Sequence, residues 1–305
     1  MAEDSNEPPR KSGKCAWPLT RRVLLGGALS LTATHVLAES AEGGRGTDIL
    51  RFGLTPVFLS NDLDVLDELQ TFLSRKTGRD VQLVTQRTYQ EVTALLVAGS
   101  LEAAWICGYP FRKFRDELTL VATPLWRGRP LYQSYLIVGE ERGATSLEDC
   151  RGDIHAFSDP DSNSGYLVTK AYLAERHLNE ASFFRRTFFT YGHRNVIRAV
   201  ASGLANSGSV DGYVWEVMRN IEPELVTRTK VLVKSSWHGF PPVAAPAKLK
   251  GTTVLESLRS AFLDIASDPV GRSVLQRLQL DGFVDAPPST FDSIAANIDL
   301  VRRLG

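Results

Sequence analysis

The chain has 305 residues, 43% of them hydrophobic, and its 35 Lys and Arg residues balance its 35 Asp and Glu residues. This length and apolar content suffice for about two domains with buried cores. The lack of a basic excess argues against a nucleic-acid partner, so we expect a small molecule or another protein instead.

The first segment has the pattern of an export signal. Paired arginines, Arg21 and Arg22, precede a short apolar run that ends in small residues near Ala38. The run is too short and too rich in Gly, Ser and Thr for a comfortable membrane span, and the arginine pair resembles a twin-arginine signal. We expect residues 1–38 to be cleaved on export to the periplasm and residues 39–48 to be a linker. An uncleaved anchor helix is the alternative.

From residue 49 the chain alternates strand-like and helix-like segments. The predicted elements are strand 50–54, helix 63–76, strand 81–84, helix 89–98 and strand 103–106. This order predicts a parallel α/β sheet, in which ligands bind beyond the carboxyl ends of the strands. Thr55, Cys107 and Tyr109 follow strands and therefore fall where a binding site is expected.

The middle of the chain repeats this alternation and predicts a second α/β lobe. A strand over 132–138 runs out of the first lobe, and the predicted elements of the second are strands at 154–157, 188–191 and 210–212, with helices ending at 174 and spanning 195–202; a strand at 231–233 would be the return crossing. Helices at 254–266 and 270–277 would rejoin the first lobe. We expect a first lobe of residues 49–138 and 236–305, a second of residues 139–235, and a cleft at the hinge formed by two crossings.

The strongest functional signal is a polar turn ahead of a predicted helix, from Ser158 to Gly165. In it, Ser162, Asn163 and Ser164 precede the glycine. Hydroxyl and amide groups at the positively polarised start of a helix can bind an oxyanion without Lys or Arg. An ordinary helix N-cap has the same residues and is the commoner role.

Several motifs in order resemble a known family. They are Ser158–Gly165, Gly192–Val196, Ala199–Gly203, Val210–Glu216 and Asp268–Arg272. On these motifs the chain, from residue 50 to its end, resembles the phosphate-, phosphite- and phosphonate-binding periplasmic proteins of ABC transporters, called PhnD-like. The resemblance implies an α/β fold of the two-lobed type II periplasmic binding proteins, with two hinge crossings and a ligand cleft.

The resemblance also implies a set of ligand-binding residues. The second lobe would contribute Ser162, Asn163, Ser164, Gly165, His193 and Asp211, and the first lobe would contribute Thr55, Cys107, Gly108, Tyr109 and Tyr132. The family often has Thr at position 163, so Asn163 changes the number of hydroxyl groups in the cradle. This departure bears on the identity of the ligand more than on the fold.

Cys107 is not required by a phosphonate site. It follows a strand and precedes a glycine, which should aim it at the cleft, and a thiolate there would suit a thiophilic centre. Because it has this single pocket cysteine, the chain also resembles a narrower group, the AioX-type sensors. These sensors bind arsenite through one cysteine and signal to a membrane histidine kinase that controls arsenite oxidation. We therefore expect Cys107 to bind arsenic, as a metalloid, while Ser, Asn and His groups bond the hydroxyl groups of this uncharged trihydroxy acid.

The alternative is a phosphonate-, phosphite- or phosphate-binding component of an ABC transporter in which Cys107 is a packing residue; another small oxo-ligand is a third possibility. In each case the lobes would close on the ligand, and a histidine kinase or an ABC permease would recognise the closed form. We expect a monomer without a cofactor.

Other constellations are weaker. Ser162, His193 and Asp211 are the residue types of a hydrolase triad, but no G-x-S-x-G motif surrounds the serine, so we expect no enzyme. The histidines lack metal-ligand spacing. Cys150 lies just before a strand and is expected to be a buried free thiol, with a bridge to Cys107 as the alternative in an oxidising compartment.

Overall fold

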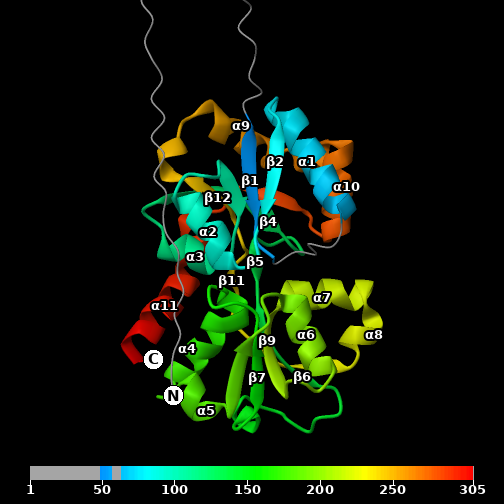
Figure 1. The fold of residues 1–305 in the computed structure, drawn as a ribbon, viewed down its shortest axis with the longest axis vertical. Coiled ribbons are helices and arrows are strands. Elements are labelled where there is room, and N and C mark those ends of the chain that lie inside the picture. The colour runs from blue at the N-terminus through cyan, green and yellow to red at the C-terminus, as the bar shows by residue number, and fades with distance from the viewer. Residues whose placement is uncertain (1–48, 57–62, 305) are drawn as a thin grey trace, which may run out of the picture. The chain divides into compact units, whose positions relative to one another are not determined.

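The computed structural model describes residues 49–56 and 63–304, which form two main β-sheets and a small third one (Figure 1). The predicted export signal (1–38) and linker (39–48) lie outside the described residues. Within them, no helix has both the length and the apolar character that a membrane crossing requires.

The first sheet has six strands in the order β13-β4-β12-β3-β1-β2. Its strands are β1 (Leu50–Leu54), β2 (Val81–Thr85), β3 (Ala103–Trp105), β4 (Leu118–Leu125), β12 (Val243–Pro246) and β13 (Gly282–Val284). The predicted parallel pairing is confirmed for β1 with β2 and β3, whereas β12 runs antiparallel to β3 and β4. The sheet is therefore mixed, because strands from the end of the chain return to it.

Six helices accompany this sheet within the described residues. They are α1 (Leu63–Thr77), α2 (Tyr89–Val97), α3 (Gly108–Lys113), α9 (Thr253–Leu263), α10 (Pro269–Leu278) and α11 (Asp292–Leu304), with short 3₁₀ turns η3 (Ala247–Leu249), η4 (Ile265–Ser267) and η5 (Pro288–Phe291). Local sequence fixes where they start. In α2, Thr88 accepts a hydrogen bond from Glu91 N–H, and the Glu91 carboxylate accepts one from Thr88 N–H, which is a capping box.

The second sheet has five strands in the order β10-β6-β9-β7-β8. Its strands are β6 (Ser134–Gly139), β7 (Ile154–Phe157), β8 (Arg186–Phe189), β9 (Ser207–Asp211) and β10 (Thr229–Lys234). The accompanying helical segments are η1 (Glu148–Cys150), η2 (Asn163–Leu167), α4 (Val168–Ala174), α5 (Glu180–Phe183), α6 (His193–Ala201), α7 (Gly212–Ile221) and α8 (Pro223–Val226). This is the predicted second α/β lobe.

The crossings between the lobes lie in the two-stranded sheet of β5 (Leu131–Tyr132) and β11 (His238–Gly239), where Tyr132 pairs with His238. The sequence had predicted one strand over 132–138 and a first lobe reaching residue 138. That boundary is wrong, because β6 pairs with β9 and β10 of the second sheet. His238 lies in the returning strand β11.

The C-terminal helix α11 packs against parts of both lobes. It contacts α3 beside the first sheet, α4 and η2 beside the second, and β11 at the crossing, and Figure 1 shows it next to α3 and α4. Leu167, the last residue of η2, lies in one apolar cluster with Phe111, Phe291 and Ile294. A residue of the second lobe is thus part of a core that otherwise consists of the first lobe and α11.

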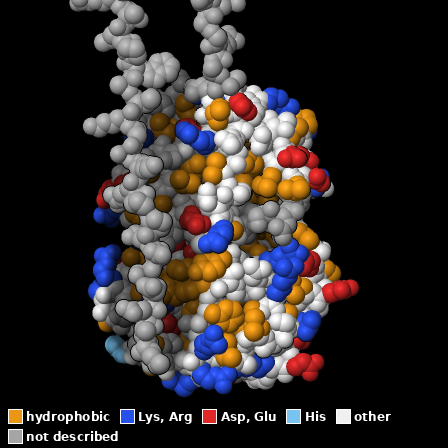
Figure 2. Space-filling view, viewed as in Figure 1, with side chains coloured by type: hydrophobic (Ala, Val, Ile, Leu, Met, Phe, Trp, Pro, Cys, Tyr) orange, Lys and Arg blue, Asp and Glu red, His pale blue; other side chains and the backbone are white. Residues whose placement is uncertain are grey.

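The surface agrees with the balanced charge of the chain. On the face that Figure 2 shows, acidic and basic side chains are interspersed, with hydrophobic side chains between them. This face presents no extended basic area of the kind that binds nucleic acid.

Candidate functional site

The main predicted site residues come together where helices begin. Cys107 precedes α3, Asn163 begins η2, His193 begins α6 and Asp211 precedes α7. None of the four is more than 2% exposed. Backbone N–H groups at a helix start have no intrahelical partner and carry partial positive charge, so the arrangement favours a bound oxo group.

Asn163 connects the second lobe to the first lobe and to the crossing. Its backbone N–H donates a hydrogen bond to Sγ of Cys107 at 3.2 Å, and its Nδ2 donates one to the Tyr132 hydroxyl at 3.0 Å. The Oδ1 atom of Asn163 is buried without a hydrogen-bond partner among the described residues. The structure therefore brings three of the predicted residues into direct contact.

His193 and Asp211 form a second group with Tyr89. Nδ1 of His193 accepts a hydrogen bond from Asp211 N–H at 3.1 Å, and burial lowers the pKa of His193 to about 3. The ring is therefore neutral with its proton on Nε2, which lies 3.2 Å from the Tyr89 hydroxyl oxygen. The Tyr89 oxygen accepts this bond, which leaves the phenol proton of Tyr89 for another acceptor.

Sequence reasoning missed Tyr89 as a site residue and treated it only as the start of a helix. Tyr89 follows β2 as Thr55 follows β1, so the rule that ligands bind beyond the carboxyl ends of parallel strands could have found it. Its backbone N–H also donates to Oδ2 of Asp159 at 3.1 Å. A carboxylate of the second lobe thus lies at the start of a helix of the first lobe.

The turn from Ser158 to Gly165 is shaped largely by its own contacts. The Ser162 hydroxyl accepts a hydrogen bond from Gly165 N–H at 2.9 Å, so this serine has the N-cap role. Ser134 Oγ donates to the Ser164 carbonyl at 2.6 Å. A Cβ on Gly165 would lie 1.8 Å from Ser158 Oγ, which explains the glycine. The η2 segment that follows is π-helical, a form common at functional sites.

The remaining predicted residues lie at the edge of this group. The Thr55 hydroxyl is buried and donates to the Trp105 carbonyl at 3.1 Å. A Cβ on Gly108 would lie 2.6 Å from Cδ1 of Ile294, so Gly108 is needed for packing against α11. Tyr109 is partly buried in α3. No hydrogen bond within the described chain connects these three residues to the Ser162–Gly165 turn.

Burial dominates the electrostatics of the group. It raises the pKa of the Cys107 thiol to about 12 against the opposing effect of the Asn163 and Tyr109 N–H groups, so the expected thiolate is wrong for the resting protein. It raises the pKa of Asp211 to about 7, although Val214 and Tyr213 donate to this carboxylate. Burial also raises the pKa of Tyr89 and Tyr132 well above the usual value, which keeps both phenols protonated.

The hydrogen bonds of the site in the described residues are made without a positively charged side chain. In the described residues, those of Cys107, Asn163, Tyr132, Tyr89 and His193 involve no lysine or arginine side chain. Neutral donors and helix starts therefore supply the positive potential.

The other singled-out residues have structural partners. His155 is buried, and its two ring nitrogens lie 2.8 and 2.9 Å from the hydroxyls of Ser207 and Ser209. Cys150 is fully buried, and both it and Cys107 are free thiols, so the alternative of a disulfide bridge is wrong. Among the described residues, no group of three or more His, Cys, Asp or Glu side chains is arranged to hold a metal ion.

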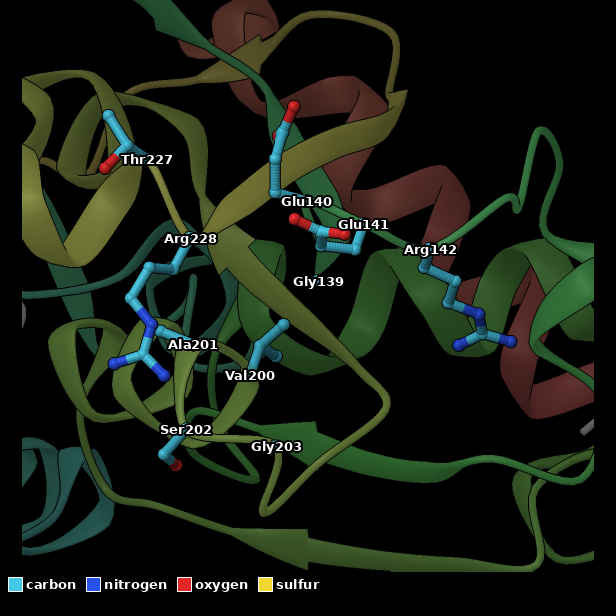
Figure 3. Close-up of a pocket in the computed structure, with 10 residues that line it drawn as sticks. All are labelled: Gly139, Glu140, Glu141, Arg142, Val200, Ala201, Ser202, Gly203, Thr227 and Arg228. Carbon is cyan, nitrogen blue, oxygen red and sulfur yellow. The ribbon is translucent and has the colours of Figure 1, made fainter.

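A surface pocket of about 480 Å³ lies in the second lobe, at the C-terminal end of α6 (Figure 3). It is lined by Gly139, Glu140, Glu141, Arg142, Val200, Ala201, Ser202, Gly203, Thr227 and Arg228. A neighbouring pocket of about 440 Å³ shares Ala201, Ser202 and Arg228 with it. Neither pocket contains a predicted site residue.

Two α/β lobes joined by two crossing strands, with a buried polar site at converging helix starts, define a periplasmic binding protein of the two-lobed type. Residues 52–291 match the family described as "ABC transporter, phosphonate, periplasmic substrate-binding protein". The chain belongs to this family, which confirms the PhnD-like resemblance. It is a family of periplasmic substrate-binding proteins.

Individual relatives agree with this assignment. The chain is 28% identical to the phosphate-import protein PhnD of Mycolicibacterium smegmatis over 249 residues, 75% of each protein. It is 29% identical to the phosphonates-binding periplasmic protein of Escherichia coli over 155 residues, 50% of this chain and 45% of that one, so the match spans less than half of that relative. A binding protein component of an ABC phosphonate transporter from Pseudomonas aeruginosa has the same fold, with a TM-score of 0.77 and 22% identity over 84% of this chain and 87% of the other. None of these three relatives is described as an arsenite sensor.

Proposed function

We propose that this protein is the substrate-binding component of an ABC transporter and that it binds a phosphonate, phosphite or phosphate between its lobes. The observation that carries the proposal is the convergence of the buried helix starts at Asn163 and His193 with the hydroxyl group of Tyr89. Backbone N–H groups at such starts stabilise oxyanions without a cationic side chain. Family membership and the names of the curated relatives support the same ligand class.

Two phenols supply further donors in this proposal. The Tyr89 oxygen accepts from His193 and the Tyr132 oxygen accepts from Asn163. Each phenol proton is therefore available to an oxygen of the ligand. Tyr89 belongs to the first lobe and Tyr132 to the crossing, so these protons complement the N–H groups of η2 and α6 in the second lobe. Ser162, Ser164 and Gly165 hold the turn in shape, and Thr55, Gly108 and Tyr109 border it.

Ligand binding is coupled to closure of the lobes in this proposal. The bonds from Asn163 to Cys107 and from His193 to Tyr89 already join the lobes. A ligand that bonds to both sides adds free energy that only the closed form gains, so it shifts the population towards that form. The permease would recognise the closed protein in the periplasm, after export directed by residues 1–38.

A second candidate function is arsenite sensing, and one observation favours it. The Cys107 thiol lies inside the site next to Asn163 N–H, and the hydrogen bonds of the site include no lysine or arginine in the described residues. Arsenous acid is uncharged and thiophilic. Its reaction with Cys107 would form an S–As bond, break an As–O bond and release one water that takes up the thiol proton. A membrane histidine kinase would then be the partner, but the relatives favour transport.

Calorimetric titration distinguishes the two functions. Methylphosphonate, phosphite, phosphate and arsenite are each titrated into the wild-type protein, Cys107→Ser and the control Cys150→Ser, under reducing conditions. We expect a phosphorus oxyanion to bind all three proteins. Arsenite binding that is lost only in Cys107→Ser would favour the sensor, and failure of every phosphorus oxyanion to bind would reject the transport proposal.

A further inference from the structure

The site contains buried acceptors as well as donors. Asn163 is completely buried, and its Oδ1 atom has no hydrogen-bond partner among the described residues. An amide oxygen can only accept hydrogen bonds, and a buried acceptor without a donor is costly. A ligand that satisfies this atom must itself carry a hydrogen-bond donor.

A carboxylate adds a second acceptor to the same group. Asp211 is 1% exposed, and its Oδ1 accepts hydrogen bonds from the N–H groups of Tyr213 and Val214 at the start of α7. Its backbone N–H donates to Nδ1 of His193, and β9, which ends at Asp211, contacts the η2 segment that contains Asn163. Burial raises the pKa of Asp211 to about 7, so above this pH an oxygen without a proton would meet the lone pairs of an ionised carboxylate in a buried space.

Carboxylates of the protein also neutralise part of the positive potential at the helix starts. Asp159 accepts from the first N–H of α2, and Asp211 accepts at the start of α7, so two of the converging helix starts already face a carboxylate. The nearby cations are engaged with other acids: Lys113 pairs with Asp161 at 3.5 Å, and Arg194 pairs with Glu222. Such a site disfavours a ligand of high negative charge.

From this donor and acceptor pattern we infer that the site selects oxo acids that keep at least one protonated oxygen, which donates to Asn163 Oδ1 or to the Asp211 carboxylate. The inference rests on the proposed function and specifies the protonation state of its ligand. A phosphonate or phosphate monoanion has such a P–OH group. A sulfonate has the same tetrahedral shape but no proton near neutral pH, so it is rejected by unpaired acceptors and not by size.

The test compares two isosteric ligands on the wild-type protein. Methylphosphonate and methanesulfonate are titrated calorimetrically at about pH 8, above the pKa of Asp211, and we expect methylphosphonate to bind at least about tenfold more tightly. Methylphosphonate is then titrated at alkaline pH in buffers of different ionisation enthalpy, where we expect net proton uptake on binding. Equal affinities for the two ligands, or binding of methylphosphonate without proton uptake, would overturn the inference. Binding of methylphosphonate in either case would leave the proposed function standing, whereas its failure to bind would reject both.

Two variants identify the acceptor. Asp211→Asn keeps the cap of α7 but introduces an amide donor, so the preference for methylphosphonate over methanesulfonate should fall by about tenfold or more. Asp268→Asn makes the same change at the carboxylate that caps α10, outside the site, and it should leave the preference unchanged. An unchanged preference in Asp211→Asn, or an equal fall in both variants, would contradict the role of Asp211.

Discussion

The backbone N–H of Asn163 donates a hydrogen bond to Sγ of Cys107 at 3.2 Å, which connects the first residue of η2 in one lobe to the residue before α3 in the other. The cysteine is therefore an acceptor as well as a buried thiol. A serine at position 107 keeps an acceptor in place, so Cys107→Ser separates the chemistry of sulfur from the contact between the lobes. This is why that variant is informative in the ligand titrations.

The contact between Tyr89 and His193 should contribute to ligand affinity. Tyr89→Phe removes the hydroxyl that accepts from His193 Nε2 and that would donate to the proposed ligand, and it leaves a buried N–H unpaired. We expect methylphosphonate affinity to fall about tenfold, corresponding to ~1.4 kcal/mol. Calorimetry measures the change. Tyr191→Phe alters an exposed tyrosine and is the control; a similar loss in both variants would speak against a specific role for the Tyr89 hydroxyl.

Gly165 should be intolerant of a methyl group. In Gly165→Ala the new Cβ would lie 1.8 Å from Ser158 Oγ, with Ser162 Oγ at 3.0 Å, so the turn must shift. Overpacking of this kind costs about 1–3 kcal/mol, which urea unfolding can measure. Gly143→Ala is the matched control because nothing lies within 4 Å of its Cβ position. Equal unfolding midpoints for the two variants would show that the turn adapts freely.

Asp211 should make stability depend on pH. Burial raises its pKa from the usual carboxyl range to about 7, so the folded protein holds a proton that the unfolded chain has released. The stability gained from this protonation is complete below the carboxyl range and is lost as pH rises from about 4 through about 7. Asp211→Asn should remove this downward slope while keeping the cap.

The effect of Asp211 is measured as the difference between the free energies of unfolding of the wild type and of Asp211→Asn as a function of pH. Burial lowers the pKa of His155 and His193 to about 3 and that of His238 to about 4, so these groups contribute stability that is lost as pH falls. They are present in the wild type and in Asp211→Asn alike. The free energy of unfolding of the wild type minus that of the variant should therefore decline between about pH 4 and pH 7. A flat difference would show that the carboxyl titrates in its ordinary range.

An ion pair outside the site also joins the lobes. Glu216 of α7 is nearly buried and lies 3.2 Å from Arg127, in the turn after β4, and 3.0 Å from Arg219 of its own helix. Because Arg127 is largely exposed, the pair is worth at most about 1 kcal/mol, and Arg127→Gln should weaken ligand affinity by up to about fivefold. Arg219→Gln removes the partner within the same lobe and should leave affinity unchanged, as calorimetry can test. The reverse order of effects would exclude the cross-lobe pair as a contributor to closure.

Much of the fold was predictable because it is local. Residues 50–54, 63–76 and 81–84 carry clear apolar periodicity, with Gly78 after the helix, and they form β1, α1 and β2. The antiparallel strands β4, β12 and β13 were missed, because their pairing joins segments far apart in the chain. The boundary at residue 138 was wrong for a related reason: the sequence of a strand does not reveal which sheet the strand enters.

The residues of the candidate site that belong to sequence motifs could be predicted. The residues that reach the site only through tertiary contacts could not. Asn163, from the Ser158–Gly165 motif, contacts Cys107, and His193 begins α6 within its own motif, while their roles in ligand binding stay predictions. Tyr89 joins them only through contact between the lobes, which no local pattern encodes. Gly108 was assigned to the ligand, but its missing side chain is explained by Ile294 of α11, a residue far along the chain.

The position of Leu167 has a thermodynamic consequence for the hinge. This residue of η2 shares an apolar cluster with Phe291 and Ile294, and α11 contacts both η2 and α3. Separating the lobes must therefore move Leu167 away from α11 or move α11 away from α3. Either motion exposes apolar surface to water. Closure around a small polar ligand would then bury apolar protein surface that the ligand does not contact. Ligand binding should therefore have a negative heat-capacity change and become more exothermic as the temperature rises.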